Sequence, residues 1–293
     1  MDYQTSKLDL LIHNIKECSL CPHECRIDRT SSRDGKCGMG DIVRIASYGP
    51  HFGEEPELVG RGGSGTIFLS GCNLLCRFCQ NFEISHYKEG FEITIEELAE
   101  IILKLQAQGC SNINFVTPTH FAAQIAQAII QSRNNGLSIP IVYNCGGYEN
   151  VETIKLMDGL IDIYMPDFKF FDNYLSGKFT NAKDYFEHAS NAIIEMHRQV
   201  GDLVIKNGTA RRGLLIRHLV MPQCAGDSRE IINFIVQNFG KDTYLNLMDQ
   251  YYPRFRAYEF PEISELISKS DYEQVVSYAR KLGFHRPKYI FGE

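Results

Sequence analysis

Residues 66–81 read TIFLSGCNLLCRFCQN. The first five residues are mostly apolar or β-branched and predict a short buried strand. Cysteines follow at positions 72, 76 and 79, with the spacing C-x3-C-x2-C. On a helix these positions would share one face and could simply pack as small buried residues. Gly71 and Asn73 are poor helix formers, so we expect a loop that carries three thiols directly after a strand.

Further along the chain, short apolar runs alternate with segments of helical periodicity. We expect strands at 66–70, 112–117, 139–144, 161–166, 213–220 and 243–247, and helices at 94–108, 121–134, 185–199, 228–238 and 271–282. Thr94 and Glu97 form a capping-box pattern at the start of the first helix. Near-continuous apolar strands are typical of a parallel sheet buried on both faces. Six β/α units predict an α/β fold, a partial (β/α)6 TIM-like barrel with its chemistry at the carboxyl ends of the strands.

Composition excludes several classes of protein. The chain has 293 residues, 44% of them hydrophobic, and a formal net charge of −6. This acidity argues against nucleic-acid binding, and no apolar run is long enough to span a membrane. The N-terminus does not resemble a secretory signal, so we expect a cytoplasmic protein. We expect an irregular, cysteine-rich extension at 1–65, a barrel at 66–253 and a helical extension packed on the barrel at 254–293.

A glycine-rich stretch, GRGGSG, occupies residues 60–65. It lacks the Gly-Lys-Ser/Thr continuation of a phosphate-binding loop. We therefore expect a flexible turn before the first barrel strand.

A second cysteine group, Cys18, Cys21, Cys25 and Cys37, has the spacing C-x2-C-x3-C-x11-C. In a reducing compartment, clustered cysteines indicate a metal or redox site. Four thiolates fit a structural zinc ion or an iron–sulfur cluster, and a structural metal such as zinc is slightly favoured. Four separate free cysteines are the remaining alternative. Basic side chains beside the group would offset thiolate charge: Arg26, Arg29, Arg33 and Lys36.

The central triplet suits an iron–sulfur cluster. A four-iron cluster needs four ligands, so three cysteines leave one iron open for chemistry. The alternative is a zinc site completed by a fourth ligand, for which His86 is the nearest candidate.

The loop at 71–81, with Phe78 before its last cysteine, resembles the signature of the radical S-adenosylmethionine (SAM) superfamily. Within that superfamily the chain is most similar to the pyruvate formate-lyase activating enzyme group. The segments CSLCPHEC (18–25), YGPHFGEE (48–55) and CQNFEIS (79–85) resemble an uncharacterised branch of it. The resemblance implies a 4Fe-4S cluster on Cys72, Cys76 and Cys79, SAM on the open iron, and a flavodoxin- or ferredoxin-like electron donor. It also implies a 5′-deoxyadenosyl radical that abstracts a hydrogen atom, with a glycyl-radical enzyme as one candidate partner.

The same resemblance assigns SAM-binding roles at the predicted strand ends, besides Phe78 in the loop. The family's Gly-Gly-Glu motif is missing, and Thr117 is expected to replace it, unless Thr117 only caps the next helix. Asn144 resembles the polar residue near the SAM amine. Asp167 and Lys169 resemble an Asp-x-Lys motif that contacts the ribose and carboxylate, with a solvated loop as the alternative. Arg217 resembles an arginine directed into the site, unless it forms a buried ion pair.

Four further residues, one histidine and three cysteines, lie outside these motifs. His120, Cys145 and Cys224 are expected to be packing or polar filler residues, although either thiol could donate a hydrogen atom near a radical. Cys110 is expected in the core.

Three functional hypotheses follow. The chain is an enzyme that installs a glycyl radical, a radical enzyme acting on another peptide or small molecule, or a non-catalytic metal scaffold. The scaffold is disfavoured because it needs no open iron.

Overall fold

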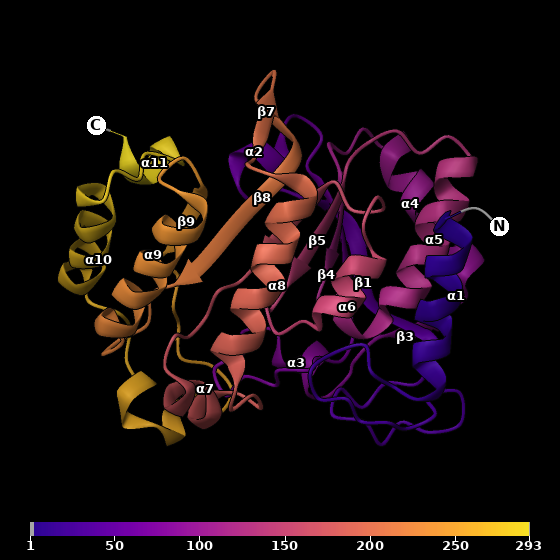
Figure 1. The fold of residues 1–293 in the computed structure, drawn as a ribbon, viewed down its shortest axis with the longest axis horizontal. Helices are drawn as coiled ribbons and strands as arrows, with labels where there is room; N and C mark the ends of the chain where they lie inside the picture. The colour runs from indigo at the N-terminus through magenta and orange to yellow at the C-terminus, as the bar shows by residue number, and fades with distance from the viewer. Residues whose placement is uncertain (1–2, 293) are drawn as a thin grey trace.

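The computed structural model describes residues 3–292, and within them a nine-stranded sheet runs through the centre. Its order is β3-β1-β2-β4-β5-β6-β8, with β7 and β9 both paired to β8 (Figure 1). The strands are β1 (Val43–His51), β2 (Ser64–Leu69), β3 (Phe91–Ile93), β4 (Ile113–Val116), β5 (Ile141–Cys145), β6 (Ile163–Pro166), β7 (Val204–Lys206), β8 (Thr209–Leu219) and β9 (Tyr244–Met248). Neighbours from β2 through β9 pair in parallel, apart from the β7–β8 hairpin. Their carboxyl ends therefore meet at one edge, the lower one in Figure 1.

Helices follow the strands and cover the outer face of the sheet (Figure 1). They are α1 (Tyr3–Lys16), α2 (Pro56–Val59), α3 (Phe82–Ser85), α4 (Ile95–Ala107), α5 (Ala122–Asn134), α6 (Val151–Leu156), α7 (Asn173–Phe179), α8 (Tyr185–Val200), α9 (Ala225–Phe239), α10 (Lys269–Lys281) and α11 (Lys288–Phe291). Short 3-10 turns lie at Thr119–Phe121, Ala257–Glu259 and Pro261–Ile263. The α/β class and an open, mostly parallel sheet consistent with a partial barrel are thus confirmed.

The six strands expected from apolar runs all form, because each run supplies side chains to both faces. Every residue of β5 and of β6 is buried. The expected capping box also forms at the start of α4. The Glu97 backbone N–H donates to the Thr94 hydroxyl at 3.1 Å, and the Thr94 N–H donates to the Glu97 carboxylate at 2.7 Å. Expected and observed boundaries differ by a few residues, as is usual at element ends.

The expectation of irregular structure across 1–65 is wrong for two elements. Helix α1 packs its apolar face, including Leu11 and Ile15, against α5 and α6. Strand β1 pairs antiparallel with β2, from Ile45 opposite Leu69 to His51 opposite Ser64, so the extension contributes to the sheet. Both elements depend on partners distant in sequence. Residues 17–42 contain neither helix nor strand, as expected.

Helix α2 closes the amino-terminal end of the barrel, at the top of Figure 1. Leu58 is fully buried among inward-facing residues of β5, β6, β8 and β9, which form an inner core separate from the outer helix–sheet core. The turn expected at 60–65 follows this helix. A Cβ on Gly62 would lie 1.8 Å from the carbonyl oxygen of Gly109, so only glycine permits this approach.

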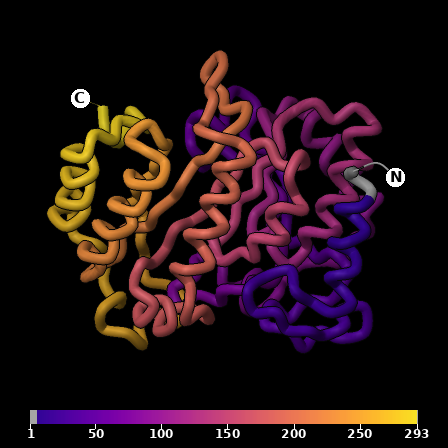
Figure 2. Tube along the Cα trace, viewed as in Figure 1, coloured from indigo at the N-terminus to yellow at the C-terminus, as the bar shows by residue number. Residues whose placement is uncertain are grey.

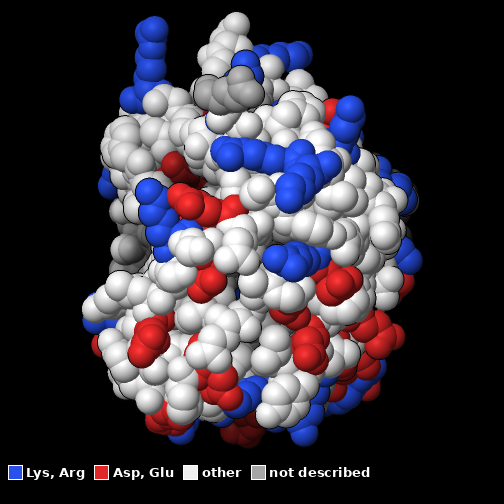
Figure 3. All heavy atoms as spheres, turned by 90° about the vertical axis from the view of Figure 1, so that its left-hand side faces the viewer, with Lys and Arg blue, Asp and Glu red and all other residues white. Residues whose placement is uncertain are grey.

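The C-terminal segment forms helices, and α10 packs on α9. The first and last parts of the described chain lie on opposite sides of the molecule (Figure 2). The face built by the C-terminal helices carries both acidic and basic side chains, without a continuous basic surface (Figure 3). Over residues 3–292, none of the helices combines the length and apolar character needed to cross a bilayer.

Candidate functional site

A pocket of about 440 Å³ lies inside the barrel and opens toward the carboxyl ends of the strands. The loop after β2 contributes Cys72, Cys76 and Cys79 to its wall. The ends of β4, β5, β6 and β8 contribute most of the polar residues expected from the sequence: Thr117, Asn144, Asp167, Lys169 and Arg217. The structure therefore brings all eight residues into one cavity.

The backbone of the cysteine loop is fixed by close contacts. Gly71 has φ +83, and a Cβ there would lie 3.1 Å from the carbonyl oxygen of Cys37. The Gly71 N–H donates to the carbonyl of Ile84 at 2.9 Å. The Asn73 amide donates to the carbonyl of Tyr148 at 2.8 Å. A glycine is thus required where the loop meets the N-terminal extension.

Hydrogen-bond donors and the ammonium group of Lys169 lie near the three thiols. The Leu74 N–H donates to Cys72 Sγ at 3.3 Å, and Cys79 Sγ lies 3.2 Å from the Ser85 hydroxyl. Burial raises the pKa of Cys72 to about 11 and also raises the pKa of Cys76, while the Lys169 ammonium opposes both shifts. A buried thiol that resists losing its proton needs a metal to become a thiolate. This donor set, backed by a lysine, fits an iron–sulfur cluster.

Asp167 and Lys169 form a partly buried ion pair in the wall of the pocket. The Lys169 ammonium lies 2.5 Å from the Asp167 carboxylate. Burial lowers the pKa of Lys169, but Asp167 and the thiols of Cys76 and Cys72 outweigh burial and raise it. The Tyr185 hydroxyl accepts from the Lys169 N–H at 2.9 Å and lies 2.6 Å from the carbonyl oxygen of Asp167. Tyr185 thereby fixes the turn that presents both charges.

Thr117 has φ +61, a strained conformation for a β-branched residue. Its N–H donates to the carbonyl of Asn144 at 2.8 Å, so the ends of β4 and β5 are linked. The alternative that Thr117 caps the next helix is wrong. Pro118 precedes the 3-10 turn and Phe121 precedes α5, with no side-chain capping bond at either position. Backbone strain beside a cavity is typical of functional sites.

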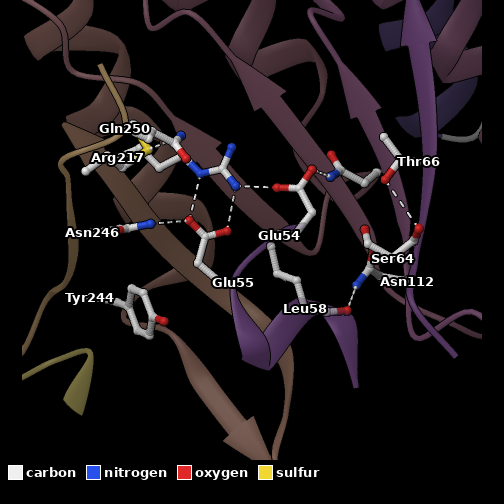
Figure 4. Close-up of polar contacts among 12 residues, drawn as sticks. Glu54, Glu55, Leu58, Ser64, Thr66, Asn112, Arg217, Tyr244, Asn246 and Gln250 are labelled. Carbon is white, nitrogen blue, oxygen red and sulfur yellow. Dashed lines mark hydrogen bonds and ion pairs between the residues drawn. The ribbon is translucent and has the colours of Figure 1, made fainter. Parts of the chain in front are cut away.

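Arg217 lines the pocket and also forms a buried ion pair, so both interpretations of this residue describe part of its environment. Its guanidinium contacts Glu55 through two bonds, at 2.7 and 2.6 Å. It also contacts Glu54 on the other side (Figure 4). Burial raises the pKa of Glu55, but Arg217 and the amide of Asn246 outweigh burial and hold that pKa below its ordinary value.

The other residues singled out from the sequence lie partly in the pocket and partly in the core. Phe78 lines the pocket with its ring packed against Phe170 and Tyr251. Cys145 lines the pocket, whereas Cys224 is buried outside its lining. Cys110 is buried in the outer core, as expected.

The two histidines singled out from the sequence, His120 and His86, both bond to backbone carbonyls. His120 is fully enclosed and donates to the carbonyl of Ser70 at 2.7 Å, consistent with a polar filler. His86, the candidate zinc ligand, donates to the carbonyl of Cys76 at 3.1 Å and packs on Phe255.

The N-terminal cysteines lie beside the cysteine loop. Cys18, Cys21 and Cys37 are buried, Cys25 is partly exposed, and the Lys36 N–H donates to Cys25 Sγ at 3.4 Å. The segment is joined to the loop, because His23 donates to the carbonyl of Asn73 at 2.8 Å. Within residues 3–292, no three His, Cys, Asp or Glu side chains converge closely enough to hold a single metal ion. The metal roles of the individual cysteines therefore stay predictions.

Sequence reasoning missed several residues of the site, notably His51, Glu54, Glu55 and Tyr185. Three of them belong to the segment YGPHFGEE, in which adjacent glutamates alone give no sign of burial. Glu149 was also missed. It is fully buried, accepts from the Thr119 hydroxyl at 2.6 Å, and burial raises its pKa to about 7.

An α/β barrel with three thiols and a polar rim at the carboxyl edge of its sheet defines the class of protein. Residues 66–217, just over half of the chain, match the radical SAM superfamily. The chain belongs to this superfamily, whose members are enzymes and which implies a 4Fe-4S cluster, SAM and SAM-dependent radical chemistry.

Two similar relatives are uncharacterized proteins of Methanocaldococcus jannaschii. MJ0674 is 32% identical over 289 residues, which cover 94% of this chain and 78% of the relative. MJ0808 is 22% identical over 274 residues, which cover 85% and 74%. A solved structure described as "Native anSMEcpe with bound AdoMet" aligns with a TM-score of 0.49 at 12% identity. The alignment covers 72% of this chain and 57% of that one.

Proposed function

We propose that the protein reductively cleaves SAM at a 4Fe-4S cluster held by Cys72, Cys76 and Cys79, and that it takes a hydrogen atom from a glycine of a partner protein. One observation carries this proposal. The three thiols share a single pocket with Thr117, Asn144, Asp167 and Lys169. A cluster held by these three cysteines would supply the electron for cleavage of SAM into methionine and a 5′-deoxyadenosyl radical.

In this proposal each group around the pocket has a role set by its chemistry. Lys169 offsets thiolate charge and donates to the SAM carboxylate or ribose, while Asp167 accepts from a ribose hydroxyl. Asn144 and the backbone at Thr117 accept from the SAM amine in place of the missing Gly-Gly-Glu motif. Phe78 supplies an apolar wall that excludes water from the reacting centre.

The glycine substrate is proposed from the Asp-x-Lys pair and the activating-enzyme-like segments. Reconstituted protein with SAM and dithionite is expected to release 5′-deoxyadenosine. With glycine peptides dideuterated at the α-carbon, deuterium is expected in that product. Deoxyadenosine free of deuterium with every glycine peptide would contradict the glycine substrate and favour another peptide or a small molecule. No deoxyadenosine at all would contradict the enzyme itself and favour a scaffold.

We also propose that Cys18, Cys21, Cys25 and Cys37 bind a closed structural metal that orders residues 17–42 against the cysteine loop. The Cys37 thiol interacts electrostatically with Arg29, Cys18 and Cys25, and the Cys21 thiol with Cys37 and Cys18, which is consistent with one cysteine group. Three of these thiols are buried, and a metal would allow all four to bind as thiolates in a segment without helix or strand of its own.

A triple variant, C72A/C76A/C79A, isolates the N-terminal group. We expect about one zinc per chain and no iron by elemental analysis. Four irons with matching sulfide would indicate a second cluster with an electron-relay or docking role. Absence of both metals would contradict the site.

The proposed reaction requires a one-electron donor, for which a flavodoxin- or ferredoxin-like protein is the proposed class. A cytoplasmic location is proposed because ten unpaired cysteines suit a reducing compartment.

A further inference from the structure

Four aromatic rings form a patch next to the cysteine loop, outside the pocket. Helix α3, below the strands in Figure 1, begins at Phe82 and is followed by His86 and Tyr87. Phe255 packs on all three, with its ring centre 5.2 Å from that of Phe82 and 4.2 Å from that of His86. It reaches this position through a φ of +53, which bulky residues rarely adopt. None of the four lines the pocket, and Tyr87 is 62% exposed, so this aromatic patch faces solvent.

The aromatic patch touches the residues expected to hold the iron–sulfur cluster. His86 donates to the carbonyl of Cys76 at 3.1 Å. Ser85, the last residue of α3, places its hydroxyl 3.2 Å from Cys79 Sγ. The patch therefore contacts two of the three cysteines directly or through one neighbouring residue. An electron that arrives at this surface has a short route to the cysteine loop without passing through the pocket.

Arginine side chains exceed carboxylates around the patch. Arg77 belongs to the cysteine loop, and its carbonyl accepts from the Arg256 N–H at 2.9 Å. Arg254 is exposed, and Arg256 pairs with Glu259 at 2.7 Å. In the part of the chain that the structure describes, no carboxylate lies within ion-pair distance of Arg77 or Arg254. With Glu83 on α3 included, three arginines oppose two glutamates, in a chain whose net charge is −6.

The position and composition of the patch favour an electron donor as its partner. In the proposed reaction, SAM and the hydrogen-atom donor would fill the pocket, so the electron has to enter from another side. Exposed aromatic rings with arginines are the typical composition of an interface core. An excess of arginine favours an acidic partner. A flavodoxin-like protein meets both requirements, because acidic side chains surround the apolar edge of its FMN ring system.

We propose that the aromatic patch, with Arg77 and Arg254 beside it, is the docking surface for an acidic, FMN-carrying donor of the flavodoxin class. This inference rests on the proposed function and adds the place where its electron enters. One electron leaves the fully reduced flavin and reduces the oxidised 4Fe-4S cluster, and no atom passes between the two proteins. The flavin is oxidised by one electron, and that electron is the one used to cleave SAM.

The test supplies the electron in two ways, from fully reduced flavodoxin and from dithionite, a small reductant that needs no docking surface. Arg254→Glu is expected to slow flavodoxin-driven release of 5′-deoxyadenosine at least about fivefold at low ionic strength, because reversing an interface charge slows association. The dithionite-driven rate should stay unchanged. Arg229→Glu is the matched control, since Arg229 is also exposed and lies over a tyrosine ring, that of Tyr278, as Arg254 does over Tyr252. Neither rate should change in this control.

Calorimetric titration with oxidised flavodoxin measures docking without any reaction. Arg254→Glu and Tyr87→Ser should each weaken binding at least about fivefold, and Arg229→Glu should not. Absence of flavodoxin binding, or equal affinity in the unmodified protein and Arg254→Glu, would overturn the docking surface. A loss of binding in these variants that occurs with a ferredoxin and not with flavodoxin would overturn the flavin donor.

The outcomes also separate this proposal from the proposed function. If dithionite drives SAM cleavage but the flavodoxin-driven rate is the same in Arg254→Glu, the docking surface fails and the enzyme stands. If flavodoxin binds with the expected dependence on Arg254 and neither reductant yields deoxyadenosine, the docking surface stands and the enzyme fails.

Discussion

Cys76→Ala should abolish formation of 5′-deoxyadenosine from SAM and leave the protein folded. Cys76 is the central thiol of the triplet, is buried, and lies close to the Lys169 ammonium. Loss of one of three thiolates removes a ligand that no neighbouring thiol can replace, because Cys72 and Cys79 already have roles. Truncating a buried cysteine to alanine removes one sulfur atom, so we expect a loss of about 1 kcal/mol in the free energy of unfolding. Product analysis, iron content and urea denaturation of the same preparation measure these effects.

Cys110→Ala is the matched control for this experiment. Cys110 is also buried, but it lies in the outer core and not in the pocket. We expect a similar small loss of stability with full SAM cleavage and full iron content. Product formation at the unmodified rate in Cys76→Ala would show that the triplet does not hold the cluster used for cleavage.

The sheet was predictable because its information is local. Each run such as 139–144 carries enough apolar side chains to be recognised without its partners. The triplet was recognisable for a similar reason, since a cluster-binding loop constrains spacing over only eight residues. Helix α1 and strand β1 were missed because their stability comes from α5 and from β2 rather than from their own pattern.

The buried cluster of Glu54, Glu55 and Arg217 was missed for a different physical reason. Glu55 and Arg217 are 162 residues apart, and their pairing exists only once the barrel closes around α2. The sequence showed a glutamate pair and an arginine but no relation between them. The positive φ of Thr117 was likewise invisible, because threonine rarely adopts it and neighbouring strands impose it.

Arg217→Met should be the most destabilising single change in the pocket wall. Methionine fills similar volume but removes the guanidinium that offsets Glu54 and Glu55, of which Glu55 is fully desolvated. Breaking a buried ion pair by removing one partner costs about 3–5 kcal/mol, because the other charge stays buried. Arg256→Met is the control, since Arg256 pairs with Glu259 on the surface with both side chains about half exposed. In urea denaturation, we expect Arg256→Met to lower the free energy of unfolding by no more than about 1 kcal/mol.

The loss in Arg217→Met should also depend on pH, and the pKa of Glu55 gives the sign. In the folded protein Arg217 holds that pKa below its ordinary value, so the pair contributes stability above the unfolded pKa. This contribution disappears as pH falls through the folded pKa. In the variant, burial without a cation raises the pKa of Glu55, so its carboxyl group is more readily protonated and burial becomes less costly. The difference in the free energy of unfolding between the two proteins should therefore be largest near neutral pH and shrink below about pH 4.5.

Adding Glu54→Gln and Glu55→Gln to the variant should restore much of the stability at neutral pH, because the unpaired buried charges are gone. A deficit that is the same at pH 4 and pH 7, or no larger than that of Arg256→Met, would show that the paired glutamates are not held by Arg217.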